Sequence, residues 1–416
     1  MTGIINYTTT TKGIGGEIKR KIPDFIVREI PRNGKKLENK AFGDWEGKKE
    51  IELKIPQQPE SMDQLYLEME KFNLDTNEAV KRIARALRFS QKRIGYAGMK
   101  DKRAITIQKI SIWQPDVQLV EKFYSRYISL SNPSWGTEKL TIGNLSKNEF
   151  EITIRNIEMK ESELKKTTEK SLKEMENGVA NYFGEQRFGG IRKVTHRVGK
   201  EFIKGNFENA IMMYLTSPAK EEEESIAIAR KNLAETKDFV KATKEFPTKF
   251  RYERLILQHL CKFPRDYVGA FQMLPKNLVY MFTHAYQSYL FNEIINERIE
   301  RGIGLKAVEG DVLEDEIPMG ALFGIDSELA TGIPGEIEKK ILKNENLKLS
   351  DFKVKGFPEL SCTGTRKKIS LKPENPKILK IMEDETNEGK LKISLSFTLD
   401  KGNYATTILR ELMKTP

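Results

Sequence analysis

Three short segments alternate apolar and polar residues, a pattern that predicts half-buried strands of an antiparallel sheet. They are residues 25–30, 51–55 and 150–154. A fourth alternating segment lies near the end of the chain, where one face carries Ile393, Leu395, Phe397 and Leu399. Because strands occur near both ends, we expect one sheet built from the two ends of the chain.

Residues 75–89 predict an amphipathic helix between the first strands. Asp75 and Glu78 have the spacing of a capping box, and the apolar side chains of Val80, Ile83 and Leu87 share one face. Residues 195–364 have a different character. Their first half is helical and charged, and its acidic run 221–224 is typical of a solvated helix start. Their second half is glycine-rich from Gly302 through Gly335 and predicts loops and short strands.

Composition indicates a soluble protein with a polyanionic partner. The 416 residues carry a formal net charge of +11, with 31% charged and 38% hydrophobic residues. The pI is near 9.2 and the mean hydropathy is −0.54. A basic balance favours a polyanion such as nucleic acid, although many lysine-rich proteins bind nothing acidic.

Several classes of site are disfavoured. Cys261 and Cys362 are far apart, so we expect no zinc site or disulfide framework and a reducing compartment. Only three histidines occur, none at metal-ligand spacing, and no Walker P-loop is present. The first residues lack a signal peptide, and no apolar run has membrane-spanning length. We therefore expect a cytoplasmic protein without cofactor, metal or membrane contact.

Residues 96–108, YAGMKDKRAITIQ, place one carboxylate, Asp101, between Lys100 and Lys102. The acid precedes a β-branched run, where the edge of a strand can hold it rigidly. Nearby cations favour an ionised carboxylate and also attract phosphate. The spacing alone fits an ordinary turn residue equally well, because Gly, Asp and Lys are common in turns.

Five motifs in one order resemble the TruD-type tRNA pseudouridine synthases. They are GMKDKRAITIQ at 98–108, KRKIPDFIVREI at 19–30, NYFGEQRFGG at 181–190, AYQSYLFNEIINERI at 285–299 and FTLDKGNYATTILREL at 397–412. The family's aspartate nucleophile corresponds to Asp101, and the lysine six residues before the strand's phenylalanine corresponds to Lys19, ahead of Phe25. The resemblance implies that both are catalytic. An alternative is that Lys19, Arg20 and Lys21 form a basic patch that binds phosphate.

The resemblance also implies residues that bind the substrate. They are Phe25, Lys100, Asn181, Phe183, Arg187 and Tyr404. A flipped uracil needs stacking and hydrogen bonds to its polar edge, which Phe183 and Asn181 can supply. Alternatively, Phe183 is a core residue and Asn181 a cap. Arg187 could contact phosphate or tie two loops together. Tyr404 stands where the family carries an aromatic residue, and Phe397 fits ordinary sheet core better.

The expected fold is α+β, with a pseudouridine-synthase catalytic domain around a mixed or antiparallel sheet. The family carries an inserted α/β domain, so we expect a discontinuous catalytic domain of residues 1–194 and 365–416 and an insert of residues 195–364. The resemblance implies a monomer that isomerises a tRNA uridine, uridine 13 of the D-arm in this family. The carboxylate would attack C1' of the ribose or remove a proton from C2', and the sequence does not choose. Alternatives are a synthase for another RNA and a non-catalytic RNA-binding protein or chaperone.

Overall fold

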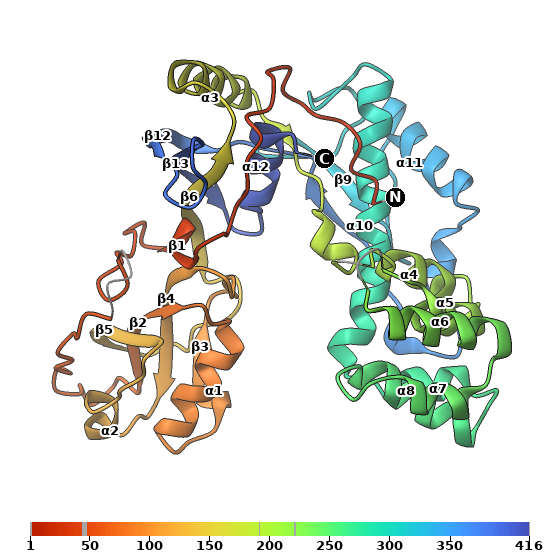
Figure 1. Cartoon of the computed structure of the whole chain (residues 1–416), viewed down its shortest axis with the longest axis horizontal. Coiled ribbons are helices and arrows are strands. Elements are labelled where there is room, and N and C mark those ends of the chain that lie inside the picture. The colour runs from red at the N-terminus through yellow and green to blue at the C-terminus, as the bar shows by residue number, and fades with distance from the viewer. Residues whose placement is uncertain (1, 44–47, 191, 220–221, 416) are drawn as a thin grey trace. The chain divides into compact units, whose positions relative to one another are not determined.

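A computed structural model describes residues 2–43, 48–190, 192–219 and 222–415 (Figure 1). The chain forms two compact units. The sheet unit consists of Thr9–Gly178 and Lys372–Pro416, and the helical unit consists of Met1–Thr8 and Val179–Leu371. The edges of these units lie at 178/179 and 371/372, whereas the sequence predicted an insert of 195–364.

The sheet unit is built on eight strands in the order β12-β13-β6-β1-β4-β2-β5, with β3 on β4. Their bounds are β1 Phe25–Pro31, β2 Gln64–Phe72, β3 Ile94–Tyr96, β4 Ile105–Trp113, β5 Ile128–Gly136, β6 Leu145–Ile157, β12 Glu374–Glu383 and β13 Leu391–Asp400. Strands β1 and β4 are parallel and the other pairs are antiparallel, so the sheet is mixed. The α+β fold with a mixed sheet that the sequence predicted is confirmed.

The two ends of the chain meet in this sheet, as the alternation of apolar residues predicted. Strand β13 pairs with β6, and Phe397 lies opposite Phe150. The alternating residues Ile393, Leu395, Phe397 and Leu399 are all buried. The strand predicted at 51–55 is wrong, because these residues form no strand. The Ile55 amide donates instead to a side chain, Glu121 Oε1, at 2.8 Å.

The helix predicted at 75–89 is confirmed with a shorter span, as α1 Thr76–Ala86. Asp75 caps it by accepting a hydrogen bond from the amide of Glu78 at 2.9 Å. The Glu78 carboxylate accepts from Arg82 Nε at 2.8 Å, so its partner lies one turn along the helix. Val80 and Ile83 are buried in one core cluster with residues of β2 and β4. The other helices of this unit are α2 Val117–Glu121, α3 Glu161–Met175 and α12 Ala405–Met413.

The helical unit matches the two halves predicted for the middle of the chain. Its helices are α4 Thr195–Ile203, α5 Phe207–Thr216, α6 Glu224–Thr236, α7 Phe239–Glu245, α8 Arg251–Lys262, α9 Tyr267–Gln272, α10 Lys276–Glu300 and α11 Gly332–Asn344. Short strands follow, β8 Leu313–Glu314, β9 Ile317–Leu322 and β10 Thr365–Lys368. The acidic run does precede a helix start at Glu224, but Glu222 pairs with the buried Arg230, and Glu221 lies outside the described residues.

A two-stranded ribbon marks where the chain enters and leaves the helical unit. Strand β7 Val179–Ala180 pairs antiparallel with β11 Ser370–Leu371, so that Ala180 lies opposite Ser370. Consequently the NYFG motif, which begins at Asn181, belongs to the helical unit. Within the described ranges, no helix of either unit combines the length and apolar character needed to cross a membrane.

Candidate active site

The Asp101 loop, residues 97–104, connects β3 to β4 in the sheet unit. Strand β4 is shared along one edge: β1 pairs with residues 105–107 and β3 with residues 110–112. Polar side chains from neighbouring elements hold the loop. Gln108 Nε2 donates to the carbonyl of Gly98 at 2.9 Å, and the Lys100 amide donates to Thr76 Oγ1 at 3.0 Å. The carboxylate of Asp101 remains accessible, with 41% of its side chain exposed.

Lys19 brings a cation to this carboxylate. Its Nζ lies 3.3 Å from Asp101 Oδ1 and 4.1 Å from the centroid of the Phe25 ring. The Lys19 side chain is 18% exposed, so the pair is partly shielded from water. Lys19 has a φ of 58°, in the left-handed region that non-glycine residues seldom occupy and that often marks functional sites. The structure therefore brings together Lys19, Phe25 and Asp101.

Hydrogen bonds hold the segment from Lys19 to Asp24 in place. Arg103, two residues after Asp101, donates to the carbonyls of Lys19 and Arg20 at 2.6 and 2.8 Å. Further along, the amide of Lys21 donates to Asp24 Oδ2 at 2.6 Å, and the buried Arg155 donates to Asp24 Oδ1 at 2.8 Å. These bonds fix the backbone from which the Lys19 ammonium reaches Asp101.

Lys100 points away from solvent, unlike its neighbour in the motif. Its Nζ lies 2.6 Å from Glu29 Oε2, and the two side chains are only 4% and 1% exposed. Glu29 also accepts from the amide of Lys109 at 3.1 Å. The Lys100 ammonium, which the sequence predicted to contact substrate, is thus paired with the buried carboxylate of Glu29 in β1.

The aromatic residues of the sheet unit differ in exposure. Phe25 is 1% exposed and packs edge-on against Phe150, with ring centroids 6.2 Å apart. Phe397 stacks on Phe150 at 5.7 Å and is a core residue. Tyr404 is 50% exposed and stands directly before α12. Of these three rings, Tyr404 therefore offers the most surface to a ligand.

Phe183 and Arg187 contact α10 in the helical unit, and Asn181 contacts β10. Asn181 is buried, and its Nδ2 donates to the carbonyl of Lys368 at 2.9 Å. The Phe183 amide donates to Asn292 Oδ1 at 2.9 Å, and its ring packs edge-on against Phe291 at 5.4 Å. Arg187 Nε donates to Ser288 Oγ at 3.1 Å, while its guanidinium carbon lies 5.8 Å from the Phe183 ring.

Two lysines that contact the motif segments were missed from the sequence, namely the half-buried Lys367 and the buried Lys71. Lys367 Nζ donates to the carbonyl of Asn181 at 3.1 Å and lies 5.0 Å from the Phe183 ring. Burial lowers the pKa of Lys367 to about 7. Lys71 lies beneath the Asp101 loop. The sequence pattern could have revealed Lys71. One face of β2 carries the apolar residues Leu65, Leu67 and Met69, and Lys71 interrupts this row.

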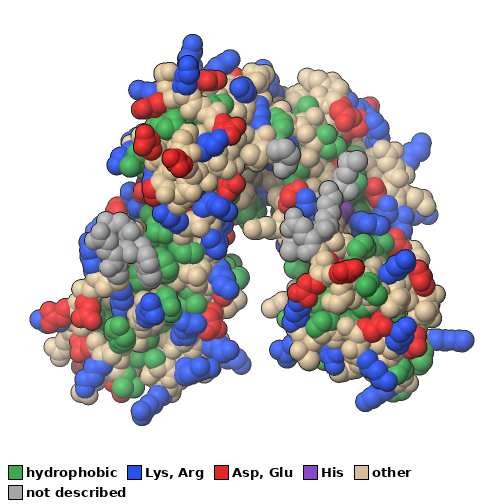
Figure 2. Space-filling model, in the orientation of Figure 1, with side chains coloured by type: hydrophobic (Ala, Val, Ile, Leu, Met, Phe, Trp, Pro, Cys, Tyr) green, Lys and Arg blue, Asp and Glu red, His purple; other side chains and the backbone are tan. Residues whose placement is uncertain are grey.

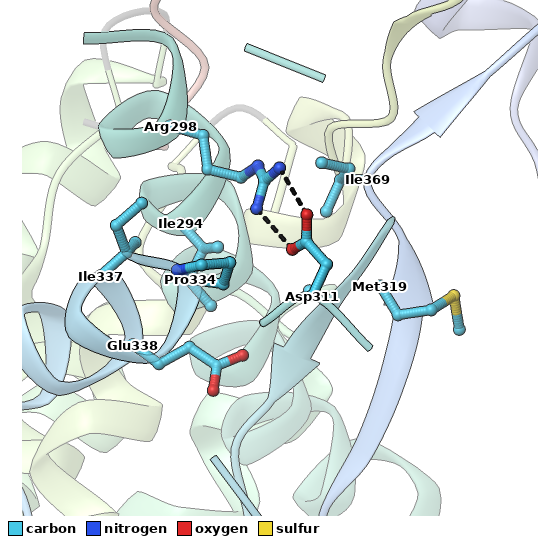
Figure 3. Close-up of a pocket in the computed structure, with 9 residues that line it drawn as sticks. Ile294, Arg298, Asp311, Met319, Pro334, Ile337, Glu338 and Ile369 are labelled. Atoms are coloured by element: carbon cyan, nitrogen blue, oxygen red, sulfur yellow. Dashed lines mark hydrogen bonds and ion pairs between the residues drawn. The ribbon is translucent and has the colours of Figure 1, made fainter. Parts of the chain in front are cut away.

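A small cavity in the helical unit offers no room for a nucleotide (Figure 3). It measures about 10 Å³, the space of roughly one water molecule. Arg298 and Asp311 line it and form a double ion pair at 2.7 and 3.0 Å. In the described ranges no cluster of three His, Cys, Asp or Glu side chains could hold a metal ion. Lys and Arg are interspersed with Asp and Glu on the face shown in Figure 2.

Comparisons with known proteins agree on one family. The family model described as tRNA pseudouridine synthase D (TruD) matches residues 1–319 and 313–412. A Methanosarcina acetivorans protein named "Probable tRNA pseudouridine synthase D" is 41% identical over 99% of this chain and 96% of its own. A relative of the same name from Methanopyrus kandleri is 40% identical over 83% of this chain and 84% of its own.

A solved structure shares the fold as well. The crystal structure of the TruD protein from Methanosarcina mazei superimposes with a TM-score of 0.81, at 38% identity, over 100% of this chain and 97% of the other. The mixed sheet and these matches define a protein of the pseudouridine synthase class. Within that class, the chain belongs to the TruD family.

Proposed function

We propose that this protein is a tRNA pseudouridine synthase that converts one uridine of tRNA, uridine 13 of the D-arm, to pseudouridine. The observation that carries the proposal is the Asp101 carboxylate within 3.3 Å of the Lys19 ammonium, in a chain that belongs to the TruD family. The choice of tRNA follows the names of the relatives, and the choice of uridine 13 follows the family resemblance.

The proposed reaction is an isomerisation that consumes no other reactant. The bond from C1' of the ribose to N1 of uracil breaks, the base turns, and a bond from C1' to C5 forms while C5 loses its proton. Asp101 serves either as a nucleophile at C1' or as a base at C2'. Lys19 places a positive charge 3.3 Å from this carboxylate.

Recognition of the base is assigned to the NYF motif of the helical unit. We assign the polar edge of uracil to Asn181 and ring contact to Phe183, with Tyr404 as the exposed aromatic of the sheet unit. Phe183 is 9% exposed, so a ring in this position contacts a base by its accessible part only. The guanidinium carbon of Arg187 lies 5.8 Å from the centroid of the Phe183 ring, so Arg187 supplies a positive charge beside the motif.

The decisive experiment maps pseudouridine in unmodified tRNA transcripts after incubation with the purified protein. Wild type should modify one position, and Asp101→Asn should modify none while keeping its fold and most of its tRNA affinity. Phosphate contacts supply that affinity, so loss of one carboxylate should leave it intact. A transcript in which uridine 13 is replaced by cytidine is the matched control for position.

The outcomes separate the alternatives. Modification at another tRNA position would reject uridine 13 but keep the enzyme. Modification of other RNA in preference to tRNA would favour a synthase with a different substrate. Tight RNA binding without pseudouridine in any RNA would favour a non-catalytic binding protein or chaperone. Turnover retained by Asp101→Asn would reject the assignment of this carboxylate.

A further inference from the structure

Lys71 is a charged residue in the interior of the sheet unit. It is the penultimate residue of β2, and its exposed fraction is 0%. In the sheet it lies between Thr106 of β4 and Ile128 of β5. It shares its strand face with Leu67 and Met69, both completely buried. An apolar side chain would fill this position at lower cost, because a buried ammonium loses its hydration.

The ammonium group is directed at three backbone carbonyls. Lys71 Nζ donates to the carbonyl of Leu74 at 2.5 Å, to that of Asp101 at 2.9 Å and to that of Lys100 at 3.5 Å. The contact with Lys100 is the longest of the three, so the carbonyls of Leu74 and Asp101 are the main acceptors. No carboxylate in the described ranges forms an ion pair with Lys71 at 4.0 Å or less. The polar contacts of Lys71 therefore hold the backbone of the Asp101 loop and of the turn before α1.

The surroundings act on the charge of Lys71 in both directions. Burial lowers the pKa of Lys71 to about 7, and the positive charge of Lys100 acts in the same direction. The negative charges of Asp101 and Asp75 oppose that shift. The negative charge of Asp101, whose backbone carbonyl Lys71 contacts, therefore offsets part of the free-energy cost of burying the cation.

We propose that Lys71 is a positioning residue for the isomerisation, which fixes the backbone of Lys100 and Asp101 so that the Asp101 carboxylate stays beside Lys19. This inference rests on the proposed function of Asp101. Lys71 does not itself contact the carboxylate or the substrate in this scheme. It acts through the carbonyl of the reacting residue.

The geometry indicates why such an anchor is needed. Residues 97–104 form no helix or strand, so the loop lacks the repeating backbone bonds that hold β4 in place. Gln108 secures the loop at Gly98 and Thr76 secures it at the Lys100 amide. Lys71 is the group that engages the carbonyl of Asp101 itself. A misplacement of about 1 Å in a reacting group can cost about 100-fold in rate.

The test compares Lys71→Met with Leu67→Ala. Met keeps an unbranched side chain one atom shorter than that of Lys and removes the N–H donors, while Leu67→Ala creates a cavity on the same face of β2 without touching the loop. For Lys71→Met we expect kcat to fall by roughly 10- to 100-fold and KM for tRNA to change by less than about threefold. Leu67→Ala should lower Tm more than Lys71→Met does, yet keep kcat near that of wild type.

Chemical rescue provides a second measurement on the activity. Lys71→Ala leaves space for a small amine, and ethylammonium should restore part of its kcat, whereas Leu67→Ala should not respond. If Lys71→Met and Leu67→Ala lose kcat in proportion to their loss of stability, and no amine rescues Lys71→Ala, Lys71 is only a structural residue and the inference is overturned.

Hydrogen exchange distinguishes failure of this inference from failure of the proposed function. Amides of residues 98–104 should exchange faster in Lys71→Met than in wild type or Leu67→Ala, whatever reaction the protein performs. Faster exchange together with an inactive wild type would reject the proposed function and keep the anchoring role. Unchanged exchange in Lys71→Met, with a fully active wild type, would reject the anchoring role alone.

Discussion

The ammonium of Lys19 lies 3.3 Å from the carboxylate of Asp101, although 82 positions separate the two residues in the chain. Lys19 precedes β1 and Asp101 precedes β4, and these two strands are parallel neighbours in the sheet. The parallel pairing places the segments before the two strands at the same edge of the sheet. The relationship therefore follows from the order of the strands, and it makes Lys19 the first residue to test after Asp101.

Lys19→Met should reduce the rate of pseudouridine formation by about 10-fold or more, because it removes the ammonium that lies 3.3 Å from the Asp101 carboxylate and positions it. Affinity for tRNA should fall only slightly, because one phosphate contact among many is a small loss. Single-turnover rates at saturating tRNA provide the check.

A matched control is Lys12→Met, which removes the same charge from the same part of the chain. Lys12 is 77% exposed, and its ion-pair partner is Glu163 at 4.0 Å. Its single-turnover rate should equal that of wild type. If Lys19→Met behaves like this control in rate, and instead shows weaker tRNA binding with a shallower salt dependence, Lys19 belongs to a phosphate-binding patch.

Lys100→Met should destabilise the protein by about 3–5 kcal/mol, because it leaves Glu29 buried without its cation. Glu29 is 1% exposed, so its charge cannot be hydrated in place. Exchanging both partners, as in Lys100→Met with Glu29→Gln, should recover much of that loss. Urea unfolding of the single and double variants measures the difference.

Lys102→Met is the control for this pair, since Lys102 lies two positions on and is exposed. It should leave the free energy of unfolding within about 0.5 kcal/mol of wild type. The opposite result for Lys100→Met, with unchanged stability and a weaker salt dependence of tRNA binding, would return Lys100 to the substrate contacts that the sequence predicted.

Much of the sheet was predictable because its strands alternate with period two. Residues 393–399 and 150–154 were predicted as strands of one sheet and form β13 and β6, which the structure shows to be paired, and Asp75 indicated the start of α1. Residues 51–55 alternate as well, yet their backbone bonds go to side chains such as Glu121. The alternation of apolar and polar residues indicates which side chains are buried. It does not indicate whether a neighbouring strand is available for pairing.

The candidate site was predictable only where a motif marked it. The resemblance pointed to Lys19, Phe25 and Asp101, which the structure brings together. It also pointed to Phe183 and Arg187, which contact α10, and to Asn181, which contacts β10. It could not show that Lys100 turns inward to Glu29, because the side-chain direction depends on the conformation of the Asp101 loop. Lys71 and Lys367 lie outside the catalytic motifs, and their roles depend on carbonyl groups that a sequence does not locate.

Glu174 of α3 should make stability depend on pH below 4.5. It accepts hydrogen bonds from the amides and hydroxyls of Thr10 and Thr11, at 2.7 to 3.1 Å. Burial alone would raise its pKa, but these bonds outweigh burial and lower the pKa of Glu174 from 4.5 to about 2. The ionised form is therefore favoured in the folded protein, and the benefit is present above pH 4.5 and lost as the pH falls toward 2.

The variant Glu174→Gln should thus cost about 1 kcal/mol at pH 7, after allowance for screening by solvent, and much less near pH 2. Glu163→Gln on the same helix is the control, because the Glu163–Lys12 pair is exposed and should contribute less than about 0.5 kcal/mol. Chemical unfolding at several pH values tests both. A cost for Glu174→Gln that stays constant between pH 7 and pH 2 would contradict the assigned cause.

The last prediction concerns the boundary between the two units. Gly178 and Lys372 flank the paired strands β7 and β11, in which Val179 lies opposite Leu371. Paired residues of antiparallel strands are about 5 Å apart, so a linker of roughly three glycine and serine residues can replace residues 179–371. A chain of residues 9–178 joined in this way to residues 372–416 should unfold cooperatively, because it keeps all eight strands of the sheet. It should form no pseudouridine, since Asn181 and Phe183 are absent.

Excision of 195–364, the range expected from the sequence, should give a less stable product. That product keeps Phe183 and Phe188 but removes α10, whose Asn292 and Phe291 contact Phe183. Circular dichroism and urea unfolding of the two chains decide between the boundaries, and a more stable chain from the second excision would favour the edges at 195 and 364.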